Sequence, residues 1–244
     1  MEVEPLGTLV FVPAWNEEAS LPSVLAELRR ELRDADVLVI DDGSSDRTAE
    51  RAREAGAEVL SFPANRGLPV AIAAGYGVAV ERGYRLCGRV DADGQHPAAE
   101  LRRLLGHVRS GAADVAVGSR FVSGGEYPER RYQSPAERQL GHFVLRRLMR
   151  WRLDRPMMDA TSGMYAVNAR AAPILARPYN TGAPEVEGLI RLAHAGLVVD
   201  ELPVHMRERL SGESKLRGKK ALLLVLTVGL TVLVGDRLRR RRRS

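Results

Sequence analysis

The chain has 244 residues, which is enough to bury one sizeable hydrophobic core. Apolar residues make up 45% of it and charged residues 28%, and these ordinary proportions exclude disorder throughout. The single cysteine excludes a disulfide framework and favours a reducing compartment. Because residues 1–5 are acidic and do not form a basic segment ahead of an apolar one, we expect no secretory signal and a cytoplasmic protein.

The net charge of +6 lies at the C-terminal end of the chain. Six of the 37 basic residues are arginines between positions 237 and 243, so the remaining 31 balance the 31 acidic residues. A basic tail on a neutral body predicts an electrostatic anchor to a polyanion, either an anionic membrane surface or a nucleic acid. The alternative is a solvated terminus without a partner.

Short apolar runs alternate with longer segments of helical periodicity over the first 120 residues. The predicted strands are 9–12, 37–40, 59–62, 86–90 and 115–117, and the predicted helices between them are 21–32, 46–55, 70–81 and 97–110. This alternation predicts an α/β protein with a mostly parallel sheet, right-handed crossovers and helices on both faces. Gly75-Tyr76-Gly77 lies inside a predicted helix, so we interpret it as a site of close helix packing and not as a dinucleotide fingerprint.

The pattern loosens after residue 121. A Gly-, Pro- and Arg-rich segment runs to residue 135, and its length predicts a functional lid over a binding edge. A basic amphipathic helix is predicted at 136–151, a return to the sheet at 159–167, a helix at 185–195 and a strand at 198–203. The uncharged run 221–235 is shorter than the roughly 20 residues that span a bilayer, so it is either an interfacial helix or a C-terminal helix on the core.

Three polar clusters directly follow predicted strands, at residues 13–17, 41–44 and 91–93. Because the carboxyl ends of parallel strands meet at one edge of a sheet, we expect these clusters to share a binding edge. Asp91 and Asp93 stand one residue apart, and hard oxygen ligands spaced in this way hold Mg²⁺ or Mn²⁺, whose usual partner in an enzyme is a phosphate. The alternative is that both carboxylates cap the helix that begins near Pro97.

Four motifs together resemble family 2 of the inverting nucleotide-sugar glycosyltransferases, most closely its dolichyl-phosphate mannosyltransferase branch. They are Pro13-Ala14-Trp15-Asn16-Glu17-Glu18, Ile40-Asp41-Asp42-Gly43-Ser44-Ser45-Asp46, Asp91-Ala92-Asp93-Gly94-Gln95-His96-Pro97 and Gly118-Ser119-Arg120-Phe121. Two late segments, residues 201–203 and 209–215, are similar to the same branch. The resemblance covers about residues 9–216. It implies a GT-A fold with a nucleotide-binding half at about 1–120 and an acceptor-binding half at 121–215, followed by an apolar helix and Arg-rich tail at 216–244.

The resemblance also implies roles for single residues. Those for the nucleoside are Pro13, Trp15 and Glu17, with Asp41 or Asp42 bonding the base; core packing is the alternative for Trp15. Those for a Mg²⁺ or Mn²⁺ ion that bridges the diphosphate are Asp91, Asp93 and Gln95, with Ala92 in the same donor site. Those for the phosphates are Arg120, Arg209 and Lys215, the last two on a loop that closes about Gly212. Catalysis is assigned to Asp93 and these three cations, for each of which the alternative is a plain surface charge.

The implied reaction moves a sugar from a nucleotide diphosphate to a polyprenyl phosphate with inversion. A phosphate acceptor is already ionised near neutral pH, so in-line attack needs no strong base. A hydroxyl acceptor would need one, with Asp159 or Glu187 as candidates. The branch favours GDP-mannose and leaves UDP-sugars open. We expect a peripheral enzyme on the inner face of the membrane, with a membrane-anchoring protein as a candidate partner.

Two other functions stay open: transfer to a soluble or polysaccharide acceptor, and nucleic-acid binding through the arginine tail. The neutral body and the lack of aromatic residues in the tail count against the second, so we expect no nucleic-acid partner. The sequence departs from the branch at three positions. Trp15 stands where tyrosine is usual, His142 lies near a usual asparagine, and Tyr165 replaces a usual arginine. These departures leave the donor and the acceptor open.

Overall fold

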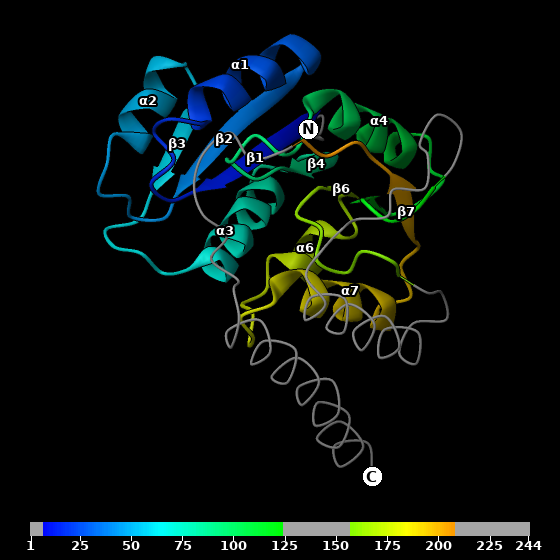
Figure 1. The fold of residues 1–244 in the computed structure, drawn as a ribbon. Coiled ribbons are helices and arrows are strands. Elements are labelled where there is room, and N and C mark those ends of the chain that lie inside the picture. The colour runs from blue at the N-terminus through cyan, green and yellow to red at the C-terminus, as the bar shows by residue number, and fades with distance from the viewer. Residues whose placement is uncertain (1–6, 124–156, 208–244) are drawn as a thin grey trace, which may run out of the picture.

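The computed structural model describes residues 7–123 and 157–207. The strands in this part of the chain form one seven-stranded sheet in the order β3-β2-β1-β4-β6-β5-β7 (Figure 1). Their bounds are β1 Thr8–Ala14, β2 Ala35–Asp41, β3 Glu58–Ser61, β4 Leu86–Arg89, β5 Val115–Ser119, β6 Tyr165–Asn168 and β7 Val199–Pro203. The helices are α1 Leu21–Glu31, α2 Thr48–Glu54, α3 Leu68–Glu81, α4 Ala98–Arg109, α6 Ala172–Leu175 and α7 Pro184–His194.

The predicted strands and helices of the first 120 residues are all present, with ends that agree to within two residues. The prediction of a mostly parallel sheet is confirmed, and the strand that departs from parallel pairing is β6, which lies antiparallel between β4 and β5. The segment predicted to return to the sheet at 159–167 pairs only from Tyr165 onward. The short helix α6 was not predicted, since four residues are too few to show a helical period.

Helices cover both faces of the sheet (Figure 1). Helices α1 and α4 share one apolar core with residues such as Val10, Val12 and Val39, while α3, α6 and α7 share the other with residues such as Phe11 and Ile40. Neighbouring residues of β1 belong to different cores because successive side chains of a strand point to opposite faces of the sheet. Both faces of the central strands are therefore buried, as their continuous apolar runs indicate.

Close packing of α3 on β1 depends on one glycine. A Cβ atom at Gly75 would lie 2.3 Å from Cδ2 of Phe11, whose ring meets Tyr76 edge to face at 4.9 Å between centroids. At Gly77 a Cβ would have no neighbour within 4 Å. The interpretation of this segment as a packing site is thus confirmed for Gly75 and wrong for Gly77.

The strand order positions the binding edge. Strand β1 lies between β2 and β4, so the chain order reverses there and the loops after these three strands meet at the carboxyl end of the sheet. Within the two described ranges no helix combines the length and the apolar character that crossing a bilayer requires. Several predictions concern residues outside the described ranges. They are the predicted lid, the helix at 136–151, the run 221–235, the arginine tail and residues His142, Arg209, Gly212 and Lys215.

Candidate functional site

The loops after β1 and β2 are hydrogen-bonded into one platform. Asn16 adopts a positive φ of 56°, its backbone N–H donates to Oγ of Ser44 at 3.0 Å, and its Oδ1 accepts from the N–H of Ser45 at 2.8 Å. The N–H of Glu17 donates to Oγ1 of Thr48 at 2.8 Å. Two motifs that lie about 30 residues apart in the sequence therefore build a single surface at the edge of the sheet.

Trp15 lies at the end of β1 and is 37% exposed, so the alternative of core packing is wrong. Its neighbours in the predicted nucleoside group differ in setting. Pro13 is buried within β1, opposite Ile40 of β2, and Glu17 accepts a hydrogen bond from Oγ of Ser20 at 2.6 Å. Trp15 is thus the member of this group that presents aromatic surface to solvent, where an indole can cover a planar ring.

Asp41 and Asp42 are each 4% exposed, and the chain uses their carboxylates differently. Asp41 accepts through Oδ1 from the N–H of Ser44 at 3.1 Å. Asp42 accepts through Oδ1 from the N–H of Arg66 at 2.7 Å and through Oδ2 from the N–H of Gly67 at 2.9 Å. Both oxygens of Asp42 therefore hold the turn that leads into α3.

The turn at Arg66 and Gly67 brings another cation to this edge, and the sequence analysis missed it. The guanidinium of Arg66 lies 5.4 Å from the ring centroid of Phe62, and the residue is exposed. Close approach of this turn depends on Gly43, which has a φ of +65° and where a Cβ would lie 2.3 Å from the carbonyl carbon of Ala64. A basic residue beside a glycine after the third strand was the available signal, since that strand ends at the same edge.

The loop after β4 is closed by its own side chains. The N–H of Asp91 donates to Nδ1 of His96 at 3.0 Å, and the N–H of Gln95 donates to Oδ1 of Asp93 at 3.0 Å. Burial holds the pKa of His96 below its ordinary value, which agrees with an unprotonated Nδ1 that accepts. His96, which belongs to the motif at residues 91–97, thus holds the backbone of this loop, a role that the sequence analysis did not assign to it.

The first N–H group of α4 is capped by a carboxylate from outside this loop, which counts against the helix-capping alternative. The N–H of Ala98, at the start of α4, donates to Oε1 of Glu27 at 3.2 Å. The Asp91 side chain is 35% exposed, and Asp93 is buried at 6%. A Cβ at Gly163 would lie 2.3 Å from Oδ2 of Asp91, so the loop before β6 packs directly on this carboxylate.

The donor chemistry of this loop fits a divalent cation bound partly by its substrate. Asp91 and Asp93 supply hard oxygen atoms at the end of β4, and Gln95 adds an amide oxygen. In the described part of the chain no three His, Cys, Asp or Glu side chains gather around one point. Mg²⁺ and Mn²⁺ suit such a site, because a few protein oxygens together with diphosphate oxygens and water complete their coordination.

Gln95 connects this loop to the end of the described chain. Its Nε2 donates to the carbonyl oxygen of Arg207 at 3.3 Å, and the N–H of Arg207 donates to the carbonyl oxygen of Gln95 at 2.9 Å. The Arg207 guanidinium also pairs with Glu27 at 2.7 and 3.0 Å. Residue 207 is therefore held beside the predicted metal loop, two positions before Arg209.

Arg120 lies at the end of β5 and is bound by a buried carboxylate. Its Nε and Nη2 donate to Oδ2 and Oδ1 of Asp159 at 2.7 and 2.6 Å. Asp159 is fully buried, and its N–H donates to Oε1 of Glu201 at 2.6 Å. Burial raises the pKa of Glu201. Arg120 thus belongs to a polar network that joins β5, β7 and the loop before β6.

The candidate bases for a hydroxyl acceptor both carry structural bonds. Asp159 holds Arg120, as described above. Glu187 accepts from the N–H groups of Asn180 and Thr181 at 3.0 Å each and pairs with Arg191 at 2.5 Å. Neither carboxylate is in the exposed, uncommitted state that suits a general base.

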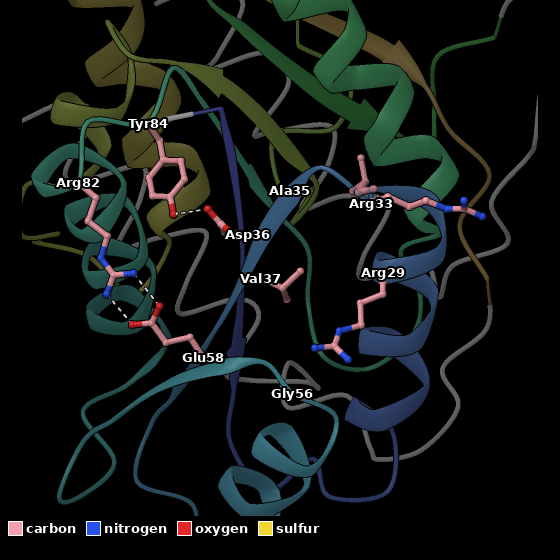
Figure 2. A pocket seen from close by; sticks show the side chains of 10 residues that line it. Arg29, Arg33, Ala35, Asp36, Val37, Gly56, Glu58, Arg82 and Tyr84 are labelled. Atoms are coloured by element: carbon pink, nitrogen blue, oxygen red, sulfur yellow. Dashed lines mark hydrogen bonds and ion pairs between the residues drawn. The ribbon is translucent and has the colours of Figure 1, made fainter. Parts of the chain in front are cut away.

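A groove of about 700 Å³ opens at the opposite end of the strands, at the starts of β2 and β3 (Figure 2). Three of its charged side chains, Arg82, Glu58 and Asp36, bond other residues that line the groove. Arg82 bonds Glu58 at 2.5 and 2.6 Å, and the hydroxyl of Tyr84 donates to Asp36 at 2.6 Å, while Arg29 points toward Gly56. Because this groove lies away from the loops after β1, β2 and β4, we assign it no part in the site.

Comparison with known proteins agrees with this geometry. Residues 9–171 match the profile of glycosyl transferase family 2. The chain is 35% identical to the undecaprenyl-phosphate mannosyltransferase of Micrococcus luteus, over 87% of this chain and 88% of that protein. It is 31% identical to the polyprenol monophosphomannose synthase of Mycolicibacterium smegmatis, over 86% of this chain and 81% of that protein.

The fold is similar to that of glucosyl-3-phosphoglycerate synthase from Mycobacterium tuberculosis, solved with Mn²⁺, UDP-glucose and phosphoglyceric acid. The TM-score is 0.69 at 22% identity, and the match covers 93% of this chain and 79% of that chain. This likeness confirms the α/β fold of GT-A type that the resemblance implied. On its sequence and its fold, the chain is a glycosyltransferase that belongs to glycosyl transferase family 2.

Proposed function

We propose that this glycosyltransferase is metal-dependent and inverting, and that it moves a hexose, with mannose favoured, from a nucleotide diphosphate to a polyprenyl phosphate. The proposal is supported by the position of residues that follow or end three strands at one edge of the sheet. The loop after β1 brings the exposed Trp15, the last residue of β2 is Asp41, and the loop after β4 brings Asp91 and Asp93. An aromatic side chain that can stack on a base, beside two carboxylates that can bind a divalent cation, suits a sugar nucleotide.

The nucleoside would lie on the platform formed by the first two loops. Trp15 would cover the base, and Pro13 and Glu17 would shape the pocket beneath it. Asp41 is a better candidate than Asp42 for a hydrogen bond to the base, because both carboxylate oxygens of Asp42 already accept hydrogen bonds from the turn at Arg66 and Gly67. GDP-mannose is the favoured donor, and a UDP-sugar remains the second candidate.

The diphosphate would lie beside the loop after β4. Asp91, Asp93 and Gln95 would hold Mg²⁺ or Mn²⁺, with the backbone at Ala92 in the same donor site. A bound cation supplies Lewis-acid stabilisation of the negative charge that develops on the departing diphosphate. The Mn²⁺ in the M. tuberculosis synthase structure supports a cation in a fold of this type.

The acceptor phosphate would be bound by cations from the second half of the chain. Arg209 and Lys215 are our candidates, and the attachment of Arg207 to Gln95 supports their approach to the same edge of the sheet. Arg120 is the third candidate, with Asp159 holding its guanidinium in a fixed orientation. The names of the Micrococcus and Mycolicibacterium relatives support a lipid phosphate as the acceptor and mannose as the sugar.

In this reaction the chain positions the acceptor phosphate and neutralises the negative charge of the two phosphate groups. The acceptor phosphate attacks the anomeric carbon in line with the leaving diphosphate, which inverts the configuration at that carbon. The nucleophile is already ionised, so no residue has to remove a proton. The structural engagement of Asp159 and Glu187 supports this route over transfer to a hydroxyl group.

We place the enzyme at the cytoplasmic face of the membrane, where a polyprenyl phosphate presents its head group. In this proposal residues 1–215 form the catalytic domain, and residues 216–244 supply an apolar helix and an arginine tail that dock on anionic lipid. Each arginine near such a surface contributes up to about 1 kcal/mol. A separate membrane protein is a candidate anchor.

The test is a donor and acceptor screen with the full chain. It is incubated with Mg²⁺ or Mn²⁺, a panel of GDP- and UDP-sugars, and either a polyprenyl phosphate or a soluble sugar acceptor, and released nucleoside diphosphate is measured. The proposal predicts release with GDP-mannose that depends on the polyprenyl phosphate. Release that depends only on the soluble acceptor would contradict it.

A further inference from the structure

A buried arginine lies two residues before the predicted metal ligand Asp91. Arg89 is in β4, and its side chain is 3% exposed. Strand alternation places it on the same face as Cys87, within the layer that contains Tyr76 of α3 and Tyr165 of β6. A guanidinium in such surroundings is tolerated only when carboxylates pair with it.

One nitrogen of this guanidinium serves two carboxylates. Nη2 of Arg89 donates to Oε1 of Glu185 at 2.9 Å and to Oδ1 of Asp91 at 3.2 Å. Nε of Arg89 has no hydrogen-bond partner, and neither has the hydroxyl of Tyr165, its register partner. Arg89 therefore makes no two-pronged grip on either carboxylate, and its charge is divided between them.

The two carboxylates differ in their surroundings. Glu185 belongs to the first turn of α7 and its side chain is 15% exposed, while the Asp91 side chain, in the loop after β4, is 35% exposed. The N-terminus of a helix favours a negative charge, which adds to the attraction of Arg89 for Glu185. The bond to Glu185 is the shorter of the two, so Nη2 of Arg89 lies closer to Glu185 than to Asp91.

We propose that the negative charge of Glu185 offsets part of the positive charge that Arg89 exerts on Asp91, and so sets the affinity of Asp91 for a divalent cation. This inference rests on the metal site of the proposed function. Arg89 and Glu185 act as positioning residues, since neither would touch the cation itself. Without the charge of Glu185, Arg89 would neutralise Asp91 more fully, and the cation would compete less well for that carboxylate.

The test measures Mn²⁺ binding and not turnover. Free Mn²⁺ is followed by electron paramagnetic resonance as it is titrated with the full chain, with GDP and, separately, UDP present. The E185Q variant is expected to raise the Kd for Mn²⁺ about tenfold, the lower end of the range for residues that support a metal ligand. The double variant R89M/E185M removes both charges with apolar side chains, and its Kd is expected to stay within about threefold of wild type.

A matched control lies two residues along the same helix. Glu187 has a similarly covered side chain, at 11% exposed, but it bonds Arg191 and the turn at Asn180 and not Arg89. The E187Q variant loosens α7 without touching Asp91, so its Kd for Mn²⁺ should equal that of wild type. An E185Q Kd equal to that of wild type, or an equal weakening in E187Q, would overturn the inference.

The double variant decides the matter if E185Q does not fold, which a circular dichroism melt would show. A double variant that binds Mn²⁺ tenfold more weakly than wild type would overturn the inference. Product formation by wild type without any Mn²⁺ binding would also overturn it while leaving the transfer reaction intact. Mn²⁺ binding that follows the expected order, with no transfer from any sugar nucleotide, would instead contradict the proposed function alone.

Discussion

Gly163 packs against Asp91 so closely that a Cβ atom on the glycine would lie 2.3 Å from Oδ2 of the aspartate. The two residues are 72 positions apart, and the glycine belongs to the loop between the Arg120 partner Asp159 and strand β6. The second half of the chain therefore shapes the position of a carboxylate that we assign to the metal site.

Replacing Gly163 with alanine should impair turnover more than folding. The methyl group must displace the end of the Asp91 side chain, which moves at little cost in stability but away from its position in the loop after β4. A displacement of about 1 Å at a reacting centre costs up to roughly 100-fold in rate. We expect kcat for sugar transfer to fall at least about tenfold. A melting temperature lowered in proportion to the activity would instead assign Gly163 a structural role only.

Gly75 and Gly77 should respond in opposite ways to the same substitution. At Gly75 the added methyl collides with the Phe11 ring, and overpacking of this kind costs about 1–3 kcal/mol. At Gly77 it meets nothing, and alanine in a helix is more stable than glycine by roughly 0.5–1 kcal/mol. Urea denaturation of G75A and G77A measures both changes. Equal destabilisation of the two variants would contradict the packing described for α3.

Trp15 should matter for nucleotide binding. The residue is 37% exposed at the end of β1, so part of its side chain faces solvent, where a base can stack on it. An aromatic contact with a base is worth about 0.5–1.5 kcal/mol, which predicts a rise of roughly threefold to tenfold in the Kd for the nucleoside diphosphate. Calorimetric titration measures this Kd, and W15F should recover most of the affinity. An unchanged Kd in W15A would remove Trp15 from the nucleoside pocket.

Asp114 should make the fold sensitive to acid. It joins three strands by accepting from the N–H of Val198 at 2.9 Å, from Asn168 at 2.8 Å and from Arg170 at 3.0 Å. Burial opposes its ionisation, but these donors outweigh burial and lower its pKa below the ordinary 3.8. A carboxyl whose pKa is lower in the folded state stabilises the fold above its unfolded pKa. That stability is lost as the pH falls through the folded value.

The D114N variant tests this pH dependence. At neutral pH it should be less stable than wild type by about 1–3 kcal/mol, the cost of weakened buried hydrogen bonds. The difference should narrow as the pH falls below about 4, because wild type then loses the same contribution. Denaturant melts at a series of pH values measure it, and a difference that is constant across this range would contradict the assignment to Asp114.

The sequence predicted the first half of the fold because local pattern determines it. Runs of β-branched residues and helical periods recur in strict alternation there, and each strand pairs in parallel with a neighbour. The direction of β6 could not be read in this way, since parallel and antiparallel partners show the same side-chain alternation. Its place between β4 and β5 follows from tertiary pairing with both strands.

The candidate site was predictable where single loops carry it and not where distant residues meet. The clusters at residues 13–17, 41–44 and 91–93 do lie at one edge, because strand order brings their loops together. The bonds of Arg120 to Asp159 and of Arg89 to Glu185 join residues 39 and 96 positions apart. Arg89 also stands inside an apolar run, where the sequence indicates a strand and gives no sign of Glu185 beside it.

The most direct test of the proposed function is transfer of labelled mannose from GDP-mannose to a polyprenyl phosphate, followed by extraction into organic solvent. The full chain with Mn²⁺ should place label in the organic phase, and both a chelator and the D93N substitution should abolish it. The D36N variant, which alters a carboxylate at the opposite end of the strands, should retain transfer. Label that reaches the lipid equally well with D93N, or no lipid-bound label under any of these conditions, would contradict the proposal.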